Sequence, residues 1–492
     1  MPRPLLYEIN TRCWLRELSD CRATAIHLGN VPETEFVFWK RMGFTHLWLM
    51  GVWTTGPQSR KRFLQSPDTA QRLNRVLPNW REEDVAGSPY AIAEYRVPDR
   101  LGGEQGLRQF RERLHQHGIG LLLDFVPNHV GLDHPWVIQR PELFVTAPQM
   151  SGEMFLQKTI HGPRWIAHGK DPFFPAWIDT AQFDLRRADT RTALLDDLRS
   201  VAARCDGVRC DMAMLALNDV FTRMWENFPA DKAASVGGEF WAEAIARVKR
   251  PGFLFVAEAY WDLEPSLQSL GFDYTYNKRV TDFVVERRWP QLQEHLLGLG
   301  DEVLRRSVHF LENHDEPRIA GRLSPAEHRA AAFLTLTLPG MCLLHEGQLS
   351  GAQTHVPVQL GRRPSEPVNQ EVQALYVRLL EILPRTVVGR GHGQVLRPLG
   401  VSAAEGDSAK NIIVVHWSEK EASFDLAAVN IGSTPARCRI LPPQVELESR
   451  RCLASDFMVE SSQSSVLDST PGQGLLLELP PHGEAVLQCR PV

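Results

Sequence analysis

A chain of 492 residues with 43% hydrophobic and 23% charged residues is long enough for two or three globular domains. Its formal net charge of -5 and isoelectric point near 6.4 argue against a nucleic-acid-binding protein, which usually shows a basic balance. No run of 18 consecutive apolar residues occurs, which argues against a membrane-spanning helix.

The cysteines and the N-terminus point to a cellular compartment. The eight cysteines are scattered without a CxxC pair or metal-ligand spacing, a pattern typical of reduced thiols in a cytosolic protein. Glu8 and Asn10 interrupt the first apolar residues, so this segment lacks the uninterrupted apolar core of a secretory signal. We therefore expect a cytoplasmic protein.

The first part of the chain alternates short apolar strands with amphipathic helices. The apolar runs predict strands at 5–10, 45–50 and 120–126, and the spacing of apolar residues predicts helices at 33–42 and 103–117. Residues 53–95 predict a long polar loop, and a loop of that length is typical of a functional segment.

The alternation stops at residue 131 and resumes at residue 188. Residues 131–187 are rich in Pro, Trp, His and Phe and predict an inserted subdomain, domain B. Eight strands alternating with helices predict a (β/α)8 TIM barrel built from residues 1–130 and 188–385. The further strands are expected at 207–212, 253–257, 272–276, 307–311 and 341–344, and the helices at 188–203, 218–250, 264–270, 279–298 and 325–337.

The character of the chain changes after residue 385. Residues 386–492 predict a C-terminal all-β sandwich, because strand-like runs alternate with turns rich in Gly, Pro and Ser. These runs lie at 411–415, 422–431, 436–441 and 474–479.

Polar clusters follow four of the predicted barrel strands. A barrel gathers its reactive groups at the C-terminal ends of its strands, so these clusters are expected to meet. Arg209 and Asp211 are two residues apart on a strand and share a face, and a carboxylate beside a guanidinium stays ionised at neutral pH. The clusters are Asp124 with Asn128 and His129, Arg209 with Asp211, Glu258 alone, and Asn313 with His314 and Asp315.

The acids suggest a division of chemical roles. An ionised Asp211 is suited to attack an electrophilic carbon. Glu258 follows an apolar strand, and an apolar setting raises the pKa of a carboxyl so that it can hold a proton to donate. Asp315, beside His314, could bind substrate hydroxyls and stabilise positive charge. One nucleophile and one acid, roughly 5–5.5 Å apart, is the arrangement for retaining glycoside cleavage.

These clusters resemble the four signature regions of the alpha-amylase clan of retaining glycoside hydrolases, and the chain is glycoside hydrolase family 13-like. The resemblance implies that Asp211 is the nucleophile, Glu258 the general acid/base and Asp315 the transition-state stabiliser. The inserted subdomain and the sandwich match that clan's domains B and C. The matching segments are Leu123-Asp124-Phe125-Val126-Pro127-Asn128-His129, Asp206–Asp211, Val256-Ala257-Glu258-Ala259 and Glu312-Asn313-His314-Asp315.

The resemblance also implies a substrate-binding set. Gly87-Ser88-Pro89-Tyr90 resembles the segment whose Tyr stacks on the sugar, so Tyr90 is expected to form that platform. The remaining members are Asp124, which would support the hydrogen bonds of the site, His129 and His314, which would bind the sugar, and Arg209, which would orient Asp211.

One segment departs from the clan's pattern. Met212-Ala213-Met214-Leu215 is apolar where the clan's amylases carry Lys and His, which weakens the case for long starch chains. The departure also weakens the case for the calcium site often built near Asn128, so we expect no cofactor, with calcium near Asn128 as the alternative. Residues 131–136 resemble the start of domain B in maltosyltransferase-like members.

The leading hypothesis is a retaining hydrolase of α-glucosidic linkages in α-glucans, maltooligosaccharides or small α-glucosides, with no nucleic acid or membrane as partner. The alternative is an α-glucan transglycosylase or maltosyltransferase-like enzyme with a sugar or phosphate acceptor. A metal-dependent barrel hydrolase would use His129, His314 and the Asp residues as ligands, but the HxH pair expected after its first strand is missing. A non-catalytic relative would typically lose one of the three acids, which this chain keeps.

Overall fold

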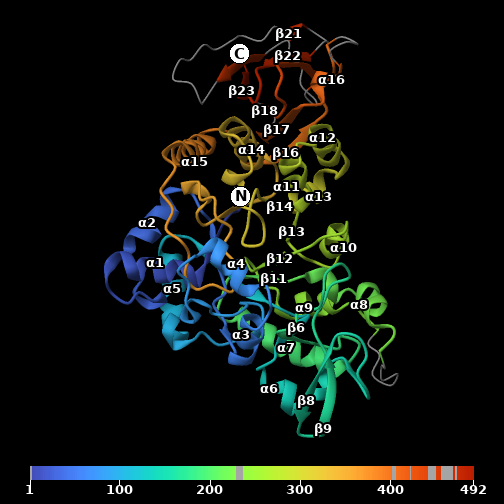
Figure 1. Ribbon diagram of the computed structural model, residues 1–492. Helices are drawn as coiled ribbons and strands as arrows, with labels where there is room; N and C mark the ends of the chain where they lie inside the picture. The colour runs from blue at the N-terminus through green and yellow to red at the C-terminus, as the bar shows by residue number, and fades with distance from the viewer. Residues whose placement is uncertain are drawn as a thin grey trace.

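The molecule has a closed barrel at its centre, an inserted segment on one side of it and antiparallel sheets on the other (Figure 1). The computed structural model describes residues 3–228, 237–401, 406–420, 423–441, 450–455, 469–470 and 474–491. Across these residues, no helix combines the length and the apolar character needed to cross a bilayer.

Eight parallel strands close the barrel, as the alternation of strands and helices predicted. Each strand pairs with the next one in chain order, and the last pairs with the first. The strands are β1 (Leu5–Asn10), β2 (His46–Met50), β5 (Gly120–Phe125), β11 (Gly207–Cys210), β12 (Leu254–Ala257), β13 (Tyr274–Tyr276), β14 (Ser307–His309) and β15 (Met341–His345).

The barrel interior changes from apolar to charged along the strands. Leu6, Leu122 and Val256 are fully buried in an apolar cluster inside the barrel. Two residues further along their strands stand Glu8, Asp124 and Glu258, also buried. Because alternate residues of a strand share a face, the same pattern that fills the barrel with apolar side chains turns these carboxyl groups inward.

Helices surround the barrel, with two differences from the sequence expectation. The helix expected at 279–298 is two helices, because Arg287 adopts a left-handed φ of 57° and Pro290 stands in the first turn of the second helix. Within the expected 218–250 helix, two helices are described and residues 229–236 lie outside the described part. The main helices are α1 (Thr11–Arg22), α2 (Glu33–Arg41), α5 (Gly103–Gln116), α7 (Ala188–Ala202), α8 (Asn218–Trp225), α9 (Phe240–Val248), α10 (Glu264–Ser269), α11 (Lys278–Val285), α12 (Trp289–Gly298), α14 (Pro325–Thr337) and α15 (Gln370–Ile382).

The prediction of a long polar loop at 53–95 is wrong about the secondary structure. This segment contains helices α3 (Pro57–Leu64) and α4 (Thr69–Val76) and a short antiparallel pair of strands, β3 (Thr54–Thr55) and β4 (Ile92–Glu94). The helices bury few apolar side chains, and these pack against Leu360, far away in the sequence. Their periodic signal is therefore weak in the sequence, and the tertiary contact decides their structure.

The segment after β5 forms small antiparallel sheets of its own. β6 (His129–Gly131) pairs with β10 (Thr180–Gln182), and β9 (Gly162–Ala167) pairs with β7 (Thr146–Ala147) and β8 (Met154–Thr159). The pairing of β6 with β10 ties the end of the insertion to the residues that follow β5. The limits of the three domains stay predictions.

The C-terminal part contains two antiparallel sheets, in agreement with the predicted sandwich. β16–β17–β18–β23–β20 form one sheet and β19–β22–β21 the other, with an apolar cluster that includes Leu426, Ile440 and Leu477. Trp417 Nε1 donates to the carbonyl of Thr337 in α14 (2.8 Å), which joins this part to the barrel. The strands are β16 (His392–Leu396), β17 (Ile412–Lys420), β18 (Ser423–Asn430), β19 (Ala436–Ile440), β20 (Arg450–Ser455), β21 (Ser469–Thr470), β22 (Gly474–Leu479) and β23 (Glu484–Pro491).

Candidate active site

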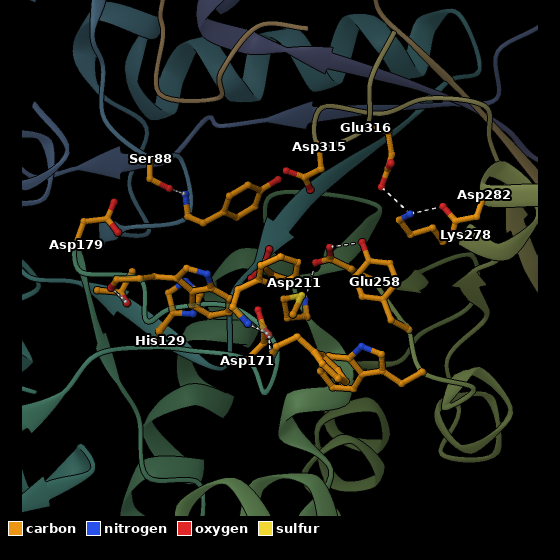
Figure 2. A pocket seen from close by; sticks show the side chains of 18 of the residues that line it. Ser88, His129, Asp171, Asp179, Asp211, Glu258, Lys278, Asp282, Asp315 and Glu316 are labelled. Carbon is orange, nitrogen blue, oxygen red and sulfur yellow. Dashed lines mark hydrogen bonds and ion pairs between the residues drawn. The ribbon is translucent and has the colours of Figure 1, made fainter. Parts of the chain in front are cut away.

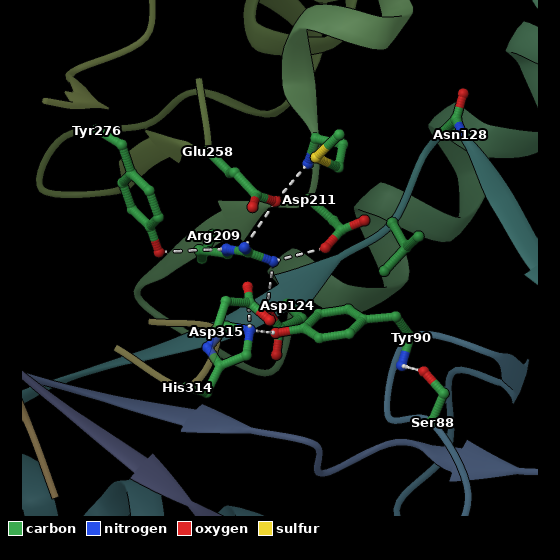
Figure 3. A network of polar contacts seen from close by, with 12 residues as sticks. Ser88, Tyr90, Asp124, Asn128, Arg209, Asp211, Glu258, Tyr276, His314 and Asp315 are labelled. Atoms are coloured by element: carbon green, nitrogen blue, oxygen red, sulfur yellow. Dashed lines mark hydrogen bonds and ion pairs between the residues drawn. The ribbon is translucent and has the colours of Figure 1, made fainter. Parts of the chain in front are cut away.

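Arg209 joins the acids that the sequence placed on different strands (Figure 3). Its Nη1 donates to Asp211 Oδ1 at 2.7 Å and lies 3.5 Å from Asp124 Oδ1. Its Nη2 lies 2.7 Å from Glu258 Oε2, an ion pair whose alignment is not that of a hydrogen bond. One buried guanidinium on β11 therefore contacts a carboxyl group on β5 and the two carboxyl groups that directly follow β11 and β12.

Aromatic rings enclose this guanidinium. The guanidinium carbon of Arg209 lies 5.0 Å from the centre of the Trp48 ring, 5.3 Å from that of Tyr90 and 5.7 Å from that of Tyr276. Burial opposes the charge, but the carboxylate of Glu258 and the other acidic groups around it raise the pKa of Arg209 well above its ordinary value. The rings leave Arg209 little room to move, so it holds Asp211 in one orientation.

Two opposing effects act on the ionisation of Asp211. Burial raises the pKa of Asp211 above its ordinary value, although the charge of Arg209 and its hydrogen bond act in the opposite direction. Removal from water is thus the larger of these opposing effects, and the ionisation of Asp211 beside Arg209 at neutral pH stays a prediction. The direct hydrogen bond from Arg209 still favours the ionised form of Asp211 over that of Glu258, which lacks one.

Glu258 has the environment expected of a proton donor. Burial raises its pKa to about 7, against the opposing charge of Arg209. Its Oε2 accepts from the backbone N–H of Met212 (2.7 Å), and its Oε1 accepts from the hydroxyl of Tyr260 (2.8 Å). Met212 reaches this contact in a left-handed conformation with φ of 41°, a sparsely populated state for a residue other than Gly. The sharp turn after Asp211 thus holds the carboxyl of Glu258 in place.

Asp315 and His314 form an ion pair at the opposite wall. His314 Nε2 lies 3.0 Å from Asp315 Oδ2 and 2.7 Å from the hydroxyl of Tyr90. Its surroundings oppose ionisation of Asp315, but the positive charge of His314 outweighs them and lowers the pKa of Asp315 to about 2. The Asp315 side chain is 47% exposed, unlike Asp211 and Glu258, so its charge faces the cavity.

Asp124 lies behind these groups. It is 2% exposed, and burial raises its pKa to about 7 despite the nearby charge of Arg209. Trp53 Nε1 donates to the backbone carbonyl of Asp124 (2.8 Å), which holds the end of β5 against the neighbouring loop.

The three acids open onto one cavity of about 820 Å³ (Figure 2). Tyr90 and His129 also line it, whereas Asp124, Arg209 and His314 are buried and do not. The predicted set therefore divides into groups that face the cavity and groups that support them. The further lining residues are Ser88, Asp171, Phe173, Phe174, Trp177, Asp179, Thr180, Met212, Tyr260, Trp261, Glu264, Lys278, Arg279, Asp282, Glu316 and Gln359.

His129 meets the cavity as a neutral imidazole. Burial lowers its pKa to about 3, and its ring lies 4.9 Å from that of Trp177, centre to centre. The Nδ2 of Asn128 lies 3.3 Å from His129 Nδ1, and an amide nitrogen can only donate. His129 Nδ1 therefore accepts, and the proton on Nε2 is left to donate to a ligand.

The surroundings of Asn128 do not fit the calcium site suggested as an alternative. Asn128 Oδ1 accepts from Gln182 Nε2 (3.0 Å), and Asn128 Nδ2 donates to Gln182 Oε1 (3.2 Å). The side-chain oxygen that a cation would need is thus used by a buried amide pair. In the part of the chain that the structure describes, no group of three or more His, Cys, Asp or Glu could hold a metal ion. This finding includes His129 and His314, which a metal-dependent barrel hydrolase would use as ligands.

Several residues of the site were not predicted from the sequence. Tyr260 and Trp261 follow Glu258 by two and three residues, so their position after a barrel strand was a usable signal. Phe173 and Phe174, 68% and 71% exposed, sit in the inserted segment, where no pattern marked them. Glu8, on β1, was noted solely as a break in an apolar run.

Comparisons with known proteins agree with this geometry. The model of the alpha amylase catalytic domain matches residues 35–181. Alpha-amylase MalA of Haloarcula japonica is 25% identical over 376 residues, which is 74% of this chain and 50% of that protein. The chain is therefore similar to members of the alpha-amylase family. A 1,4-alpha-glucan branching enzyme, GlgB 2 of Clostridium perfringens strain SM101, is 23% identical over 55% of this chain and 36% of that enzyme.

The fold of this chain recurs in solved structures. The noncanonic maltogenic alpha-amylase AmyB from Thermotoga neapolitana aligns over 99% of both chains with a TM-score of 0.69 and 19% identity. The chain spans half or less of the length of the two relatives above. Its own activity therefore has to be argued from its own residues.

Proposed function

We propose that this protein is a member of the alpha-amylase family and a retaining glycoside hydrolase that cleaves α-glucosidic linkages in α-glucans, maltooligosaccharides or small α-glucosides. The observation that carries the proposal is the contact of one guanidinium with two carboxyl groups, Asp211 and Glu258, at the wall of a cavity. Each carboxyl lies 2.7 Å from a terminal nitrogen of Arg209, so one guanidinium holds both acids beside the same cavity. Retaining cleavage requires a separation of roughly 5–5.5 Å.

The two steps use the protonation states that the site favours. In the first step, Asp211 attacks the anomeric carbon as Glu258 gives its proton to the glycosidic oxygen, so the leaving sugar departs neutral and a glycosyl ester forms on Asp211. In the second step, the Glu258 carboxylate takes a proton from water, whose oxygen displaces Asp211. A Glu258 with a pKa of about 7 suits both directions of transfer.

Asp315, Tyr90 and His129 would bind the sugar on which this chemistry occurs. Asp315 presents a carboxylate with a pKa of about 2, which stays charged and can stabilise positive charge on the ring. Tyr90 stacks on His314 with ring centres 5.4 Å apart and presents its ring to the cavity. The neutral His129 adds a donor for a sugar hydroxyl.

The charge of the cavity bears on the acceptor. Among the described residues that line it, eight carry carboxyl groups and two, Lys278 and Arg279, are cationic. Lys278 is paired with Asp282 and Glu316, and Arg279 with Asp262. A phosphate group would therefore meet a surplus of negative charge and no unpaired cation among these lining residues. The charge favours water or a sugar hydroxyl over phosphate as acceptor.

The test is product analysis on maltose, maltooligosaccharides, sucrose and trehalose, with and without phosphate, for the parent, D211N and D282N. Asp282 lines the same cavity but pairs with Lys278, so D282N is the matched control. We expect D211N to lose a factor of about 10³ or more in kcat/KM, about 4 kcal/mol of transition-state stabilisation, and D282N to stay within about tenfold of the parent. Near-parental cleavage by D211N contradicts the nucleophile assignment.

Transfer to a sugar is the second candidate, and one observation favours it. Phe173 and Phe174 line the cavity and are largely exposed, and the half-buried Trp261 also lines it, with its ring 5.3 Å from that of Phe173. Exposed aromatic rings beside a polar site are suited to the apolar face of a sugar ring. A sugar held there after the first step could take the place of water, so products longer than the substrate at high maltose concentration support transfer.

A further inference from the structure

Glu8 is a buried acid that the mechanism above does not use. It lies on β1, between Trp48 of β2 and His345 of β15 in the register of the barrel, and none of its surface is exposed. A carboxyl group inside a barrel loses its hydration and is retained at low cost only when it has an internal partner. Its Oε2 has no hydrogen-bonding partner among the described residues, so a single contact carries its charge.

That contact is with His314. Glu8 Oε1 lies 2.5 Å from His314 Nδ1, although the two residues are 306 positions apart in the chain. The other ring nitrogen of His314 faces Asp315 and Tyr90. Each nitrogen therefore faces a carboxylate, an arrangement satisfied when both nitrogens carry a proton.

We propose that Glu8 is a positioning residue that holds His314 as an imidazolium facing Asp315 and Tyr90. Glu8 touches neither the cavity nor the acids, so it acts through His314. The negative charge of Glu8 stabilises the positive charge of His314. The positive charge of His314 in turn keeps Asp315 ionised at the place where Asp315 would contact the sugar. The role at Asp315 rests on the proposed function, whereas the protonation of His314 does not.

The charges around His314 support this assignment. Burial opposes its protonation, but the carboxylates of Asp315 and Glu8 raise the pKa of His314 well above its ordinary value. On the barrel side, the charges of Asp124 and Asp211 interact with His314, and the charge of Arg209 interacts with Asp315. On the opposite side it shares a small buried space with Arg318, His345, His355 and Arg363. The guanidinium groups of Arg318 and Arg363 disfavour a charged His314, which makes the negative charge of Glu8 the local counterweight. Burial lowers the pKa of His345 well below its ordinary value, so this ring is neutral.

The test compares E8Q with E312Q in the intact chain. The amide oxygen of Gln can still accept from His314 Nδ1–H, so E8Q removes the charge and retains the hydrogen bond. Glu312 is equally buried and lies two residues from His314, but its partners are Arg318 (2.6 Å) and the N–H of Ile319 (2.7 Å). It therefore controls for the loss of a buried carboxylate nearby. The readout is the ¹⁵N chemical shift of His314 from pH 5 to 9, assigned by its disappearance in H314N.

We expect His314 to remain an imidazolium across this range in the parent and in E312Q, and to lose a proton within it in E8Q. If cleavage is detected, the ratio of the kcat/KM of E8Q to that of the parent should be about tenfold lower at pH 8 than at pH 5, because one pKa unit corresponds to a factor of ten. A His314 that titrates near its ordinary value in the parent overturns the proposal without relying on any variant. So does an imidazolium that persists in E8Q. If His314 titrates as expected but no substrate is cleaved, the positioning role of Glu8 stands and the proposed function is contradicted.

Discussion

Asp124→Asn is the sharpest test of how burial sets charge in this site. Asp124 is almost fully buried, and burial raises its pKa from 3.8 to about 7. A carboxyl whose pKa is raised in the folded state contributes stability that is present below pH 4 and is lost as the pH rises toward 7. A shift of about three units corresponds to about 4 kcal/mol, since each unit is about 1.4 kcal/mol.

Asn resembles the protonated form of Asp124, so D124N should differ little from the parent near pH 4.5 and should be more stable than the parent at pH 8. If the whole chain unfolds as one unit, about 4 kcal/mol corresponds to a rise in Tm of about 4 °C. The assay is thermal unfolding of both proteins at the two pH values, at one scan rate.

Asp196 offers the control, because its side chain is 66% exposed on α7. D196N should show no difference in Tm that depends on pH. The reasoning about burial is refuted if the difference in Tm between D124N and the parent is the same at both pH values, or if the Tm of D124N decreases relative to that of the parent as the pH rises.

Two further predictions concern the inserted segment. Gln182 is fully buried and donates to both the side chain and the backbone of Asn128, so Q182A should cost about 1–3 kcal/mol of unfolding free energy by leaving Asn128 unpaired. The control Q157A, at a half-exposed site on β8, should change the unfolding free energy by less than about 0.5 kcal/mol. A chelator should leave the Tm of the parent unchanged, and a drop in Tm with chelator would contradict the pairing of Asn128 with Gln182. Phe173→Ala should raise the KM for maltooligosaccharides about three- to tenfold, the loss of about 0.5–1.5 kcal/mol of ring contact, with less effect on kcat. An unchanged KM, measured alongside an exposed apolar control such as Ile160→Ala, would show that the aromatic surface does not bind sugar.

The sequence was sufficient for the barrel and for the positions of its acids. Strand and helix periods differ, so eight apolar runs separated by amphipathic helices predict the closed parallel sheet that is observed. Each acid follows an apolar run, and in a parallel barrel the ends of all strands meet at one face. Asp211, Glu258 and Asp315 could therefore be assigned to one site before any distance was known.

Weaker local signals were misread. The helices of residues 57–76 carry few apolar side chains and depend on contact with Leu360, and the break at Arg287 needs one residue in a left-handed conformation. Neither feature leaves a strong period in the sequence. The signals that were read correctly are those in which many residues repeat the same pattern.

Only the tertiary structure decided the charges and partners within the site. The contact of Glu8 with His314 joins the first strand to the residues after the seventh, and the pair of Asn128 with Gln182 joins a barrel strand to the insertion. The direction of the Asp211 pKa shift depends on how completely water is removed, which the neighbouring Arg209 could not reveal from the sequence. Periodicity in a sequence reports the face on which a residue lies. The free energy of a charge depends on every group around it in space, and most of those groups come from distant parts of the chain.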